Sequence, residues 1–105
     1  MTIFTHINDL PDGLDLGPVV AVDTETMGLN LNRDRLCVVQ LSAGDGDAHL
    51  VHCPDGVWNA PNLAALFADA AVLKLFHFGR FDLAMIRRSL GVRCAPVYCT
   101  KIAAR

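Results

Sequence analysis

The apolar run Val19–Val22 ends abruptly in two carboxylates, Asp23 and Glu25, with Thr24 between them. A short continuous run rich in β-branched residues is typical of a strand buried on both faces of a sheet. Successive side chains of a strand point to opposite faces, so Asp23 and Glu25 are predicted to share one face and Thr24 to point away. The sequence therefore predicts a central strand whose C-terminal end carries two like charges side by side.

Other apolar segments of similar length fit further strands. Four are predicted: residues 36–42, 48–53 and 73–76, and a short strand that begins at Pro96. Residues 44–47 (GDGD) supply the glycines and aspartates of a hairpin turn between the first two of these. Residues 1–17 contain Pro11, Gly13 and Gly17 and are interpreted as a turn-rich lead-in.

Two segments have the composition and the period of helices. Residues 63–72 are rich in alanine and leucine, and Asn62 precedes them as the expected cap. In residues 80–91, apolar residues recur at helical spacing, arginines take the opposite face and Gly91 follows at the C′ position. The apolar positions of this second helix are Leu83, Ile86 and Leu90. The chain is expected to turn helical again after Thr100.

The predicted order of elements is three strands, a helix, a strand, a helix and a strand (β-β-β-α-β-α-β). Hairpin-linked strands followed by helical crossovers imply a mixed sheet with helices on its faces, so the expected fold class is α/β. A length of 105 residues, 52% of them hydrophobic, suits one small domain with a real core. No apolar run approaches the roughly 18 residues of a membrane span, and the N-terminus lacks the pattern of a secretory signal. A cytoplasmic protein is expected.

The four cysteines, Cys37, Cys53, Cys94 and Cys99, include no C-x-x-C pair. In a cytoplasmic chain such cysteines are expected to be reduced, buried thiols rather than disulfides. A zinc site built from Cys94, Cys99 and a histidine is an alternative, but these spacings match no standard zinc pattern.

The net charge of −2 conceals a division along the chain. Residues 1–73 carry two basic and ten acidic side chains, whereas residues 74–105 carry seven basic side chains and one acid, Asp82. The basic segment could face phosphates, although a solvated helix face explains Arg87 and Arg88 equally well. A long nucleic-acid footprint is disfavoured because it would need more lysine and arginine.

Two carboxylates as close as Asp23 and Glu25 repel each other unless one is protonated or a cation lies between them. Hard oxygen ligands at the end of a central strand suit Mg²⁺ or Mn²⁺. The alternative is that the two acids only end a strand and begin a turn. Motifs of aspartic proteases, aspartyl-nucleophile phosphatases and phosphate-binding loops are set aside, because the glycines or second aspartate that they require are missing around Thr24.

A second cluster of chemically active side chains lies in residues 76–84, FHFGRFDLA. It places Asp82 in the first turn of a helix, where the positive end of the helix dipole favours an ionised carboxylate. His77 and Arg80 lie just upstream among three phenylalanines, a combination that suits the end of a nucleotide chain. The alternative is that Asp82 is only a favourable helix-terminal charge, the phenylalanines are core residues and His77 has a structural partner.

Together the two clusters resemble the first two exonuclease motifs of the DEDD superfamily of 3′–5′ exonucleases. VAVDTETMGL and FHFGRFDL carry the resemblance, and the ribonuclease D branch is the nearest. NRDRLCVVQLS and YCTKIA make the chain most similar to the nanoRNase C type, which degrades very short oligoribonucleotides. The similarity runs from about Pro18 to Arg105. It implies a ribonuclease H-like fold, with residues 1–105 as the N-terminal portion of a single exonuclease domain and residues 18–105 carrying the two motifs.

The resemblance also assigns roles to residues. Asp23, Glu25 and Asp82 match the catalytic acids, which bind two divalent ions, Mg²⁺ or Mn²⁺. The positions that match substrate-binding residues are Thr26, Gly28, Leu29 and His77. The family's third motif, which supplies a general base and a fourth acid, is not found in these 105 residues, and the only tyrosine, Tyr98, does not match it.

The function implied is metal-dependent 3′–5′ hydrolysis of short RNA oligonucleotides to nucleoside 5′-monophosphates by a two-metal mechanism. The family also implies a homo-oligomer, which could be a ring, and no membrane partner. Two alternatives stay open: a catalytically incomplete piece that binds metal or nucleotide ends, and a DNA 3′–5′ exonuclease with the same chemistry. One sequence does not separate ribose from deoxyribose recognition.

Overall fold

The computed structural model describes residues 2–26, 35–44, 46–54, 58–77 and 80–99, except for the side chains of residues 80 and 81. Their element order is β1 (Ile3–Ile7), β2 (Val19–Thr26), β3 (Leu36–Ser42), β4 (Ala48–His52), α1 (Pro61–Ala68), β5 (Leu73–Phe76), α2 (Arg80–Leu90) and β6 (Val97–Cys99). The predicted α/β class is confirmed. The predicted helical turn after Thr100 lies outside the described residues.

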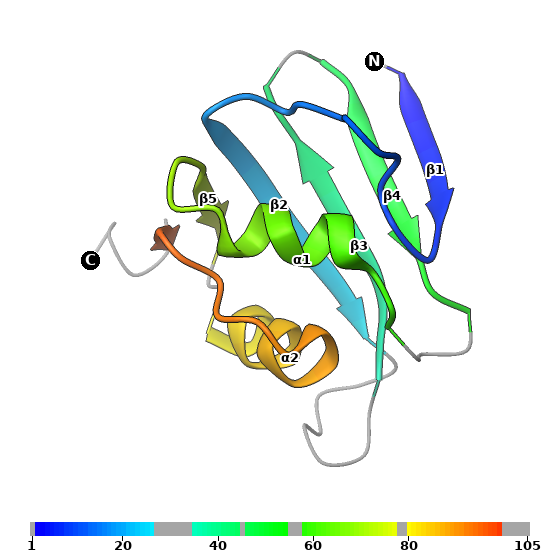
Figure 1. Ribbon diagram of the computed structural model, residues 1–105, viewed down its shortest axis with the longest axis vertical. Helices are drawn as coiled ribbons and strands as arrows, with labels where there is room; N and C mark the ends of the chain where they lie inside the picture. The colour runs from blue at the N-terminus through cyan, green and yellow to red at the C-terminus, as the bar shows by residue number, and fades with distance from the viewer. Residues whose placement is uncertain (1, 27–34, 45, 55–57, 78–79, 100–105) are drawn as a thin grey trace.

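The strands form one mixed sheet in the order β1-β4-β3-β2-β5-β6 (Figure 1). β3 runs antiparallel to both β2 and β4, whereas the pairs β1–β4, β2–β5 and β5–β6 are parallel. The hairpin predicted at residues 44–47 is confirmed between β3 and β4. Gly44 and Gly46 have φ angles of 80° and 90°, which residues with a Cβ atom rarely adopt.

The first strand, β1, was not predicted, and the interpretation of residues 1–17 as a lead-in made of turns is wrong for residues 3–7. β1 pairs in parallel with β4, from Ile3 opposite Ala48 to Ile7 opposite His52. Parallel partners are distant in sequence, so no turn signal announces the pairing. The sheet therefore has one strand more than the sequence pattern indicates.

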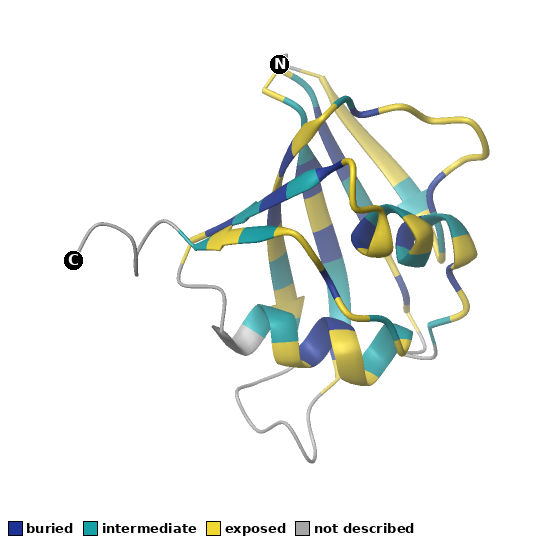
Figure 2. Ribbon diagram, turned by 60° about the vertical axis from the view of Figure 1, so that its left-hand side comes forward, coloured by how far each residue is buried: buried dark blue, intermediate teal, exposed yellow. Residues whose placement is uncertain are grey.

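Both helices cover the same face of the sheet. Figure 1 shows α1 and α2 in front of the strands. Figure 2 shows that buried and exposed residues alternate along the strands. Side chains from one face of the strands and from the two helices form one buried cluster. Its members include Val20, Val22, Val39, Leu41, Val51, Phe76, Leu63, Phe67, Met85 and Ile86.

Two predictions for the first helix are wrong. α1 ends at Ala68 rather than at residue 72, and Asn62 is its second residue rather than its cap. The cap comes instead from the lead-in: the Asp9 carboxylate accepts hydrogen bonds from the backbone N–H groups of Asn62 and Leu63, at 3.0 and 2.9 Å. A cap supplied from more than 50 residues away cannot be read from the local sequence.

Removing the Asp9 carboxylate is expected to destabilise the chain. Asp9→Ala leaves the Asn62 and Leu63 N–H groups without their acceptor, which should lower the free energy of unfolding by about 1–2 kcal/mol. Asp12→Ala is the matched control, because the exposed Asp12 carboxylate accepts from the Asn62 side chain at 2.7 Å and not from the helix backbone N–H groups that Asp9 caps. Urea unfolding measures both variants; equal losses would contradict the capping role.

The second helix agrees with its prediction. α2 spans Arg80–Leu90, and the Gly91 N–H donates to the Arg87 carbonyl at 2.9 Å. Gly91 has a φ of 70°, as a C′ glycine requires. Neither helix of the described residues is long and apolar enough to cross a membrane.

The four cysteines are free thiols. Cys53 and Cys94 are buried, whereas Cys37 and Cys99 are only partly covered. Burial raises the pKa of Cys94 to about 11, and the nearby Lys74 opposes this shift. The Cys94 thiol is therefore neutral at pH 7 and a poor nucleophile.

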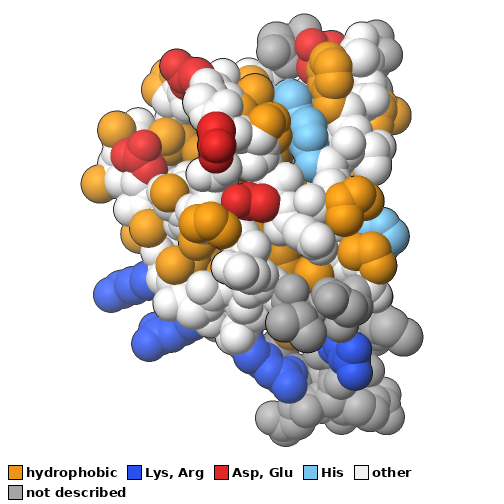
Figure 3. Space-filling model, turned by 45° about the vertical axis from the view of Figure 1, so that its right-hand side comes forward, with side chains coloured by type: hydrophobic (Ala, Val, Ile, Leu, Met, Phe, Trp, Pro, Cys, Tyr) orange, Lys and Arg blue, Asp and Glu red, His pale blue; other side chains and the backbone are white. Residues whose placement is uncertain are grey.

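Charges are separated in space as well as in sequence. On the face shown in Figure 3, Asp and Glu side chains lie in the upper part, and Lys and Arg side chains lie in the lower part, at the level of α2 in Figure 1. Arg87 and Arg88 in the last turn of α2 are both exposed. The positive end of the molecule is thus built around this helix.

A histidine pair joins the edge strand β1 to β4. The His6 Nε2 and His49 Nδ1 atoms lie 3.0 Å apart, and the two rings are stacked. Phe4 stacks on the His49 ring at a centroid distance of 5.0 Å. Burial, and secondarily the charge of His49, lower the pKa of His6 below its ordinary value of 6.5.

The histidine pair predicts a pH-dependent stability. Below pH 6.5 the unfolded chain binds a proton at His6 that the folded chain resists, so the free energy of unfolding should fall as the pH drops through this value. Urea unfolding at about pH 7 and about pH 5.5 should show a smaller loss for His6→Gln than for the parent. His52→Gln, at an exposed site on β4, is the control; the same pH dependence in the parent and in His6→Gln would contradict the prediction.

Candidate active site

The two carboxylates lie in the second half of the central strand, not after its end. β2 extends to Thr26, so the strand predicted at residues 19–22 is four residues too short. Asp23 and Glu25 are exposed and alternate with the buried Val22 and the half-buried Thr24. The predicted shared face agrees with this alternation: both carboxylates lie on the face of the sheet to which the described residues contribute no helix.

One edge of β2 is open beside these acids. The pairing with β5 ends at Ala21 opposite Leu75, whereas the pairing with β3 continues to Thr26 opposite Leu36. Within the part of the chain that the structure describes, therefore, β2 has a strand neighbour on one side only beyond Ala21. The chain leaves β5 at this point and α2 begins four residues later, which brings the first turn of α2 to the free edge.

Asp82 is held at this edge by Thr24. The Thr24 hydroxyl donates a hydrogen bond to Asp82 Oδ1. Burial raises the pKa of Asp82, the Thr24 hydrogen bond opposes that rise, and the negative charges of Asp23 and Glu25 add to it. The three acids are thus close enough to influence one another's ionisation.

A hollow of about 270 Å³ lies on the open face beside Asp23. It spans β3, β2 and the end of β5, and most of its lining is apolar. Its side chains on this face come from Ala21, Asp23, Gln40, Ser42, Leu75 and His77. His77, predicted to bind substrate, therefore lies in the same hollow as a predicted metal ligand.

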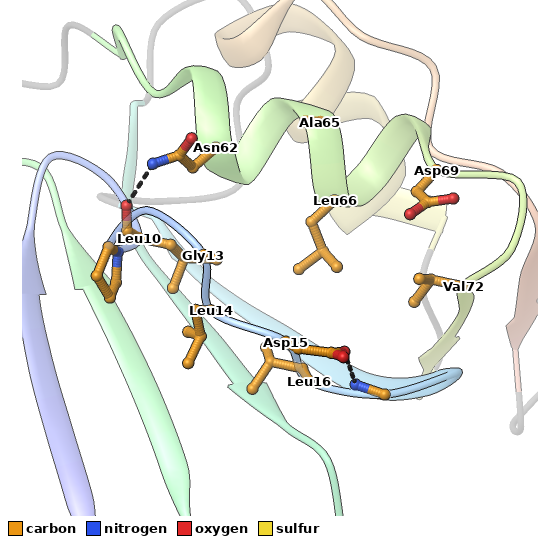
Figure 4. Close-up of a pocket in the computed structure, with 12 residues that line it drawn as sticks. Leu10, Gly13, Leu14, Asp15, Leu16, Asn62, Ala65, Leu66, Asp69 and Val72 are labelled. Atoms are coloured by element: carbon orange, nitrogen blue, oxygen red, sulfur yellow. Dashed lines mark hydrogen bonds between the residues drawn. The ribbon is translucent and has the colours of Figure 1, made fainter.

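A second hollow, of about 250 Å³, lies between residues 10–17 and α1 (Figure 4). Figure 4 shows Leu14 and Leu66 lining it, with Asp15 and Asp69 at its rim. None of the predicted site residues contributes to it. Of the two, only the hollow beside Asp23 is therefore lined by predicted site residues.

The remaining predicted site residues are distributed unevenly. Thr26 is half-buried at the end of β2, where the register with β3 shifts between Glu25 and Thr26. Gly28 and Leu29 lie outside the described residues. Thr24 was not predicted as a site residue. Side-chain alternation along the strand does predict that Thr24 points to the face opposite Asp23 and Glu25. The sequence does not show that α2 packs on that face and brings Asp82 to Thr24.

The acids fit a divalent cation in their chemistry. Asp23 and Glu25 offer hard oxygen atoms, are exposed on one face and carry like charges that a cation would neutralise. Within the described ranges, however, no three His, Cys, Asp or Glu side chains stand close enough to hold a metal ion together. Asp82 accepts a hydrogen bond from Thr24, whose side chain lies on the face of the sheet opposite Asp23 and Glu25. A cation here would take Asp23 and Glu25 as its first ligands.

Removing the Thr24 hydroxyl is expected to free Asp82. Thr24→Val keeps the β-branched shape but leaves a half-buried carboxylate without its donor, which should lower the free energy of unfolding by about 1–2 kcal/mol. Thr24→Ser keeps the hydroxyl and should recover most of that loss. Chemical unfolding compares them; equal stabilities for the two variants would contradict the role of the hydrogen bond.

The fold and the site together define a class: a mixed α/β domain with acidic residues gathered around its central strand. A sequence profile described as a 3′–5′ exonuclease matches residues 5–105. The chain belongs to this 3′–5′ exonuclease family.

Similar proteins extend this assignment. Ribonuclease D from Acidiphilium cryptum is 40% identical over 95 residues, which cover 90% of this chain and 24% of the relative. The structure of Brucella melitensis NrnC matches with a TM-score of 0.94 and 52% identity, over 99% of this chain and 52% of that one. NrnC has also been solved with bound Mg²⁺ and bound to pGG. Escherichia coli RNase D matches with a TM-score of 0.71 and 29% identity, over 83% of this chain and 23% of that one.

These matches confirm the predicted relationship to ribonuclease D-like DEDD exonucleases and the ribonuclease H-like fold. The chain spans about a quarter of the ribonuclease D relative and about half of NrnC. The assignments of individual site residues stay predictions.

Proposed function

We propose that residues 1–105 are the N-terminal portion of one 3′–5′ exonuclease domain, and that the complete domain hydrolyses short RNA oligonucleotides to nucleoside 5′-monophosphates. One observation carries the proposal: in a chain of this family, the sheet exposes Asp23 and Glu25 together, and Thr24 holds Asp82 at the same segment of β2. The partial coverage of the relatives supports the placement within a longer domain.

The short substrate is supported by similarity and by charge. NrnC, 52% identical to this chain, has been solved bound to pGG. The chain has a net charge of −2, and Arg87 and Arg88 are exposed on α2, so it offers few contacts for a long phosphate backbone. His77, in the hollow beside Asp23, is positioned to contact the terminal nucleotide. Thr26, Gly28 and Leu29 are proposed to contact the substrate as well.

The proposed chemistry depends on the acids of this chain. Asp23 and Glu25 would hold the cation, and Asp82 would supply a third carboxylate whose orientation depends on Thr24. Bound Mg²⁺ or Mn²⁺, two ions in the complete enzyme, would activate water and stabilise the charge of the leaving oxygen. The Mg²⁺-bound structure of NrnC supports the magnesium part of this proposal. A homo-oligomer is also proposed from the family resemblance, and its mass in solution would test it.

A non-catalytic binding role for the isolated chain is the second candidate. The described residues contain no group of three metal-binding side chains, which favours weak or absent turnover by these 105 residues alone. Binding of metal or of nucleotide ends does not require the complete set of ligands.

The test uses this chain both alone and fused to the half of Brucella melitensis NrnC that it does not span; the fusion is named the completed chain. Each protein is incubated with a 5′-labelled diribonucleotide and Mg²⁺ or Mn²⁺, with the matching deoxy dinucleotide as the control substrate. The completed chain should release labelled 5′-mononucleotide, faster from RNA than from DNA. No release from a folded completed chain, under conditions in which intact NrnC is active, would overturn the proposed function.

A further inference from the structure

Two cysteines lie opposite each other at one end of the pairing between β3 and β4, which are neighbours in the sheet (Figure 1). Val38 of β3 pairs with His52 of β4. One residue further along, the Cys53 N–H donates to the Cys37 carbonyl at 2.9 Å. This bond continues the antiparallel register, so Cys37 and Cys53 form a hydrogen-bonded pair. Directly opposite residues of such a pair point their side chains to the same face of the sheet.

The spacing of this pair suits a disulfide. The Cα atoms of a hydrogen-bonded antiparallel pair are about 5.5 Å apart, within the range of about 4.4–6.8 Å that disulfides span. The Cβ atoms of opposite residues are about 4.5–5.5 Å apart, whereas a disulfide needs about 3.5–4.5 Å. An approach of about 1 Å would therefore bring the two sulfur atoms within bonding distance.

The backbone on both sides of the pair can supply this approach. β4 ends at His52, so Cys53 lies just beyond the regular strand. Cys37 is the extra residue of a bulge in β3, because the partners of Glu25 and Thr26 on β3 leave it out. The chain at both cysteines is thus less constrained than it is in the middle of the sheet.

The two thiols differ in their exposure. Cys53 is 1% exposed, whereas Cys37 is only partly covered and its thiol donates weakly to the Arg35 carbonyl at 3.6 Å. Neither cysteine is in a disulfide in the structure. An oxidant can therefore reach Cys37 directly, and Cys53 is the second thiol opposite it. An accessible cysteine beside a second thiol is the usual arrangement of a reversible oxidation site.

We propose that Cys37 and Cys53 form such a site, at which a small disulfide such as oxidised glutathione converts the two thiols into a covalent bond between β3 and β4. The Cys37 thiolate attacks one sulfur of the small disulfide and releases one reduced thiol. The Cys53 thiolate then attacks Cys37 Sγ and releases the second. The protein loses two hydrogen atoms, and the small disulfide gains them. A thiol reductant reverses both steps.

The bond would fix the segment of β3 that pairs with the end of β2. Val38, next to Cys37, lies opposite the predicted metal ligand Glu25. The oxidation site is therefore close to the candidate active site, but its chemistry does not depend on the proposed reaction or on the substrate.

The first experiment treats the 105-residue chain with oxidised glutathione. The intact mass should fall by two hydrogen atoms, and peptide mapping should place the new bond between Cys37 and Cys53. Because the bond closes a loop of about 15 residues, the Tm should rise by about 5 °C or more above that of the reduced chain. Dithiothreitol should reverse both changes. Peptide mapping should find the same bond in the completed chain.

Matched variants separate this pair from the other thiols. Cys37→Ser should abolish the change of mass, whereas Cys99→Ser, which removes another partly covered thiol, should retain it. Cys53→Ala should instead retain one glutathione on Cys37, because the second thiol is missing.

Four results would overturn the proposal: no change of mass, a bond that involves Cys94 or Cys99, a lasting glutathione adduct on Cys37 of the parent, or a bonded chain no more stable than the reduced one. Failure of the completed chain to hydrolyse RNA would contradict the proposed function alone.

Discussion

Replacing Asp23 by alanine is expected to reduce the release of mononucleotide by the completed chain by at least about a hundredfold. Residues that merely orient a metal ligand already change metal affinity or activity by about 10–100-fold, and a direct ligand should matter more. Asp23 is exposed on the open face, so its removal should leave the fold intact. The measurement is the initial rate with the labelled diribonucleotide.

The same substitution has a readout that does not need turnover. Calorimetric titration of the 105-residue chain with Mn²⁺ should show affinity reduced about tenfold or more by Asp23→Ala. Asp12→Asn is the matched control, because Asp12 is an exposed carboxylate that contacts the Asn62 side chain, on the other face of the sheet. Unchanged rate and unchanged affinity in Asp23→Ala would show that the acidic pair is not the metal site.

The largest expected effect on stability belongs to Lys74. Its side chain on β5 has no exposed surface, and Nζ donates to the carbonyl oxygens of Asp69 and Ala95 at 2.6 and 2.8 Å. Burial lowers the pKa of Lys74, and the nearby Cys94 and Asp69 oppose that shift. Lys74→Ala should cost about 3–5 kcal/mol, because it opens a cavity and removes the Nζ donor from the carbonyl groups of Asp69 and Ala95.

A matched variant separates packing from hydrogen bonding. Lys74→Met retains much of the side-chain volume but cannot donate to Asp69 or Ala95, so it should cost about 1–3 kcal/mol. Guanidinium unfolding measures both variants against the parent. If the Lys74→Met chain were as stable as the parent, the two hydrogen bonds would only offset the free energy lost on burying the amine.

Elements with a complete local pattern were predicted well. β5 occupies residues 73–76 as expected, and α2 begins at Arg80 and is followed by its C′ glycine. The errors concern elements that depend on distant partners. β1 exists because β4 offers it an edge, and α1 begins where Asp9 can cap it. Neither partner is near in sequence, so periodicity could not reveal it.

The candidate site was predicted in its chemistry more than in its arrangement. Asp23 and Glu25 share a face, as alternation along a strand requires, but they lie within β2 because its pairing with β3 continues to Thr26. The link between Thr24 and Asp82 was not predicted. It needs α2 to pack against that face of β2, 58 residues further along the chain.

The sequence by itself determined the type of chemistry and the strand that carries it. The apolar run that ends in Asp23 and Glu25 specifies a strand with two carboxylates on one face, because side-chain alternation is a local property of the backbone. The expectation that this strand is buried on both faces is wrong, because Val19 and Ala21 are exposed. Only the tertiary structure decided that Thr24 holds Asp82 and that both helices of the described residues cover the face of the sheet opposite Asp23. Those outcomes depend on which distant segments compete to bury the same apolar surface, and local sequence does not encode that competition.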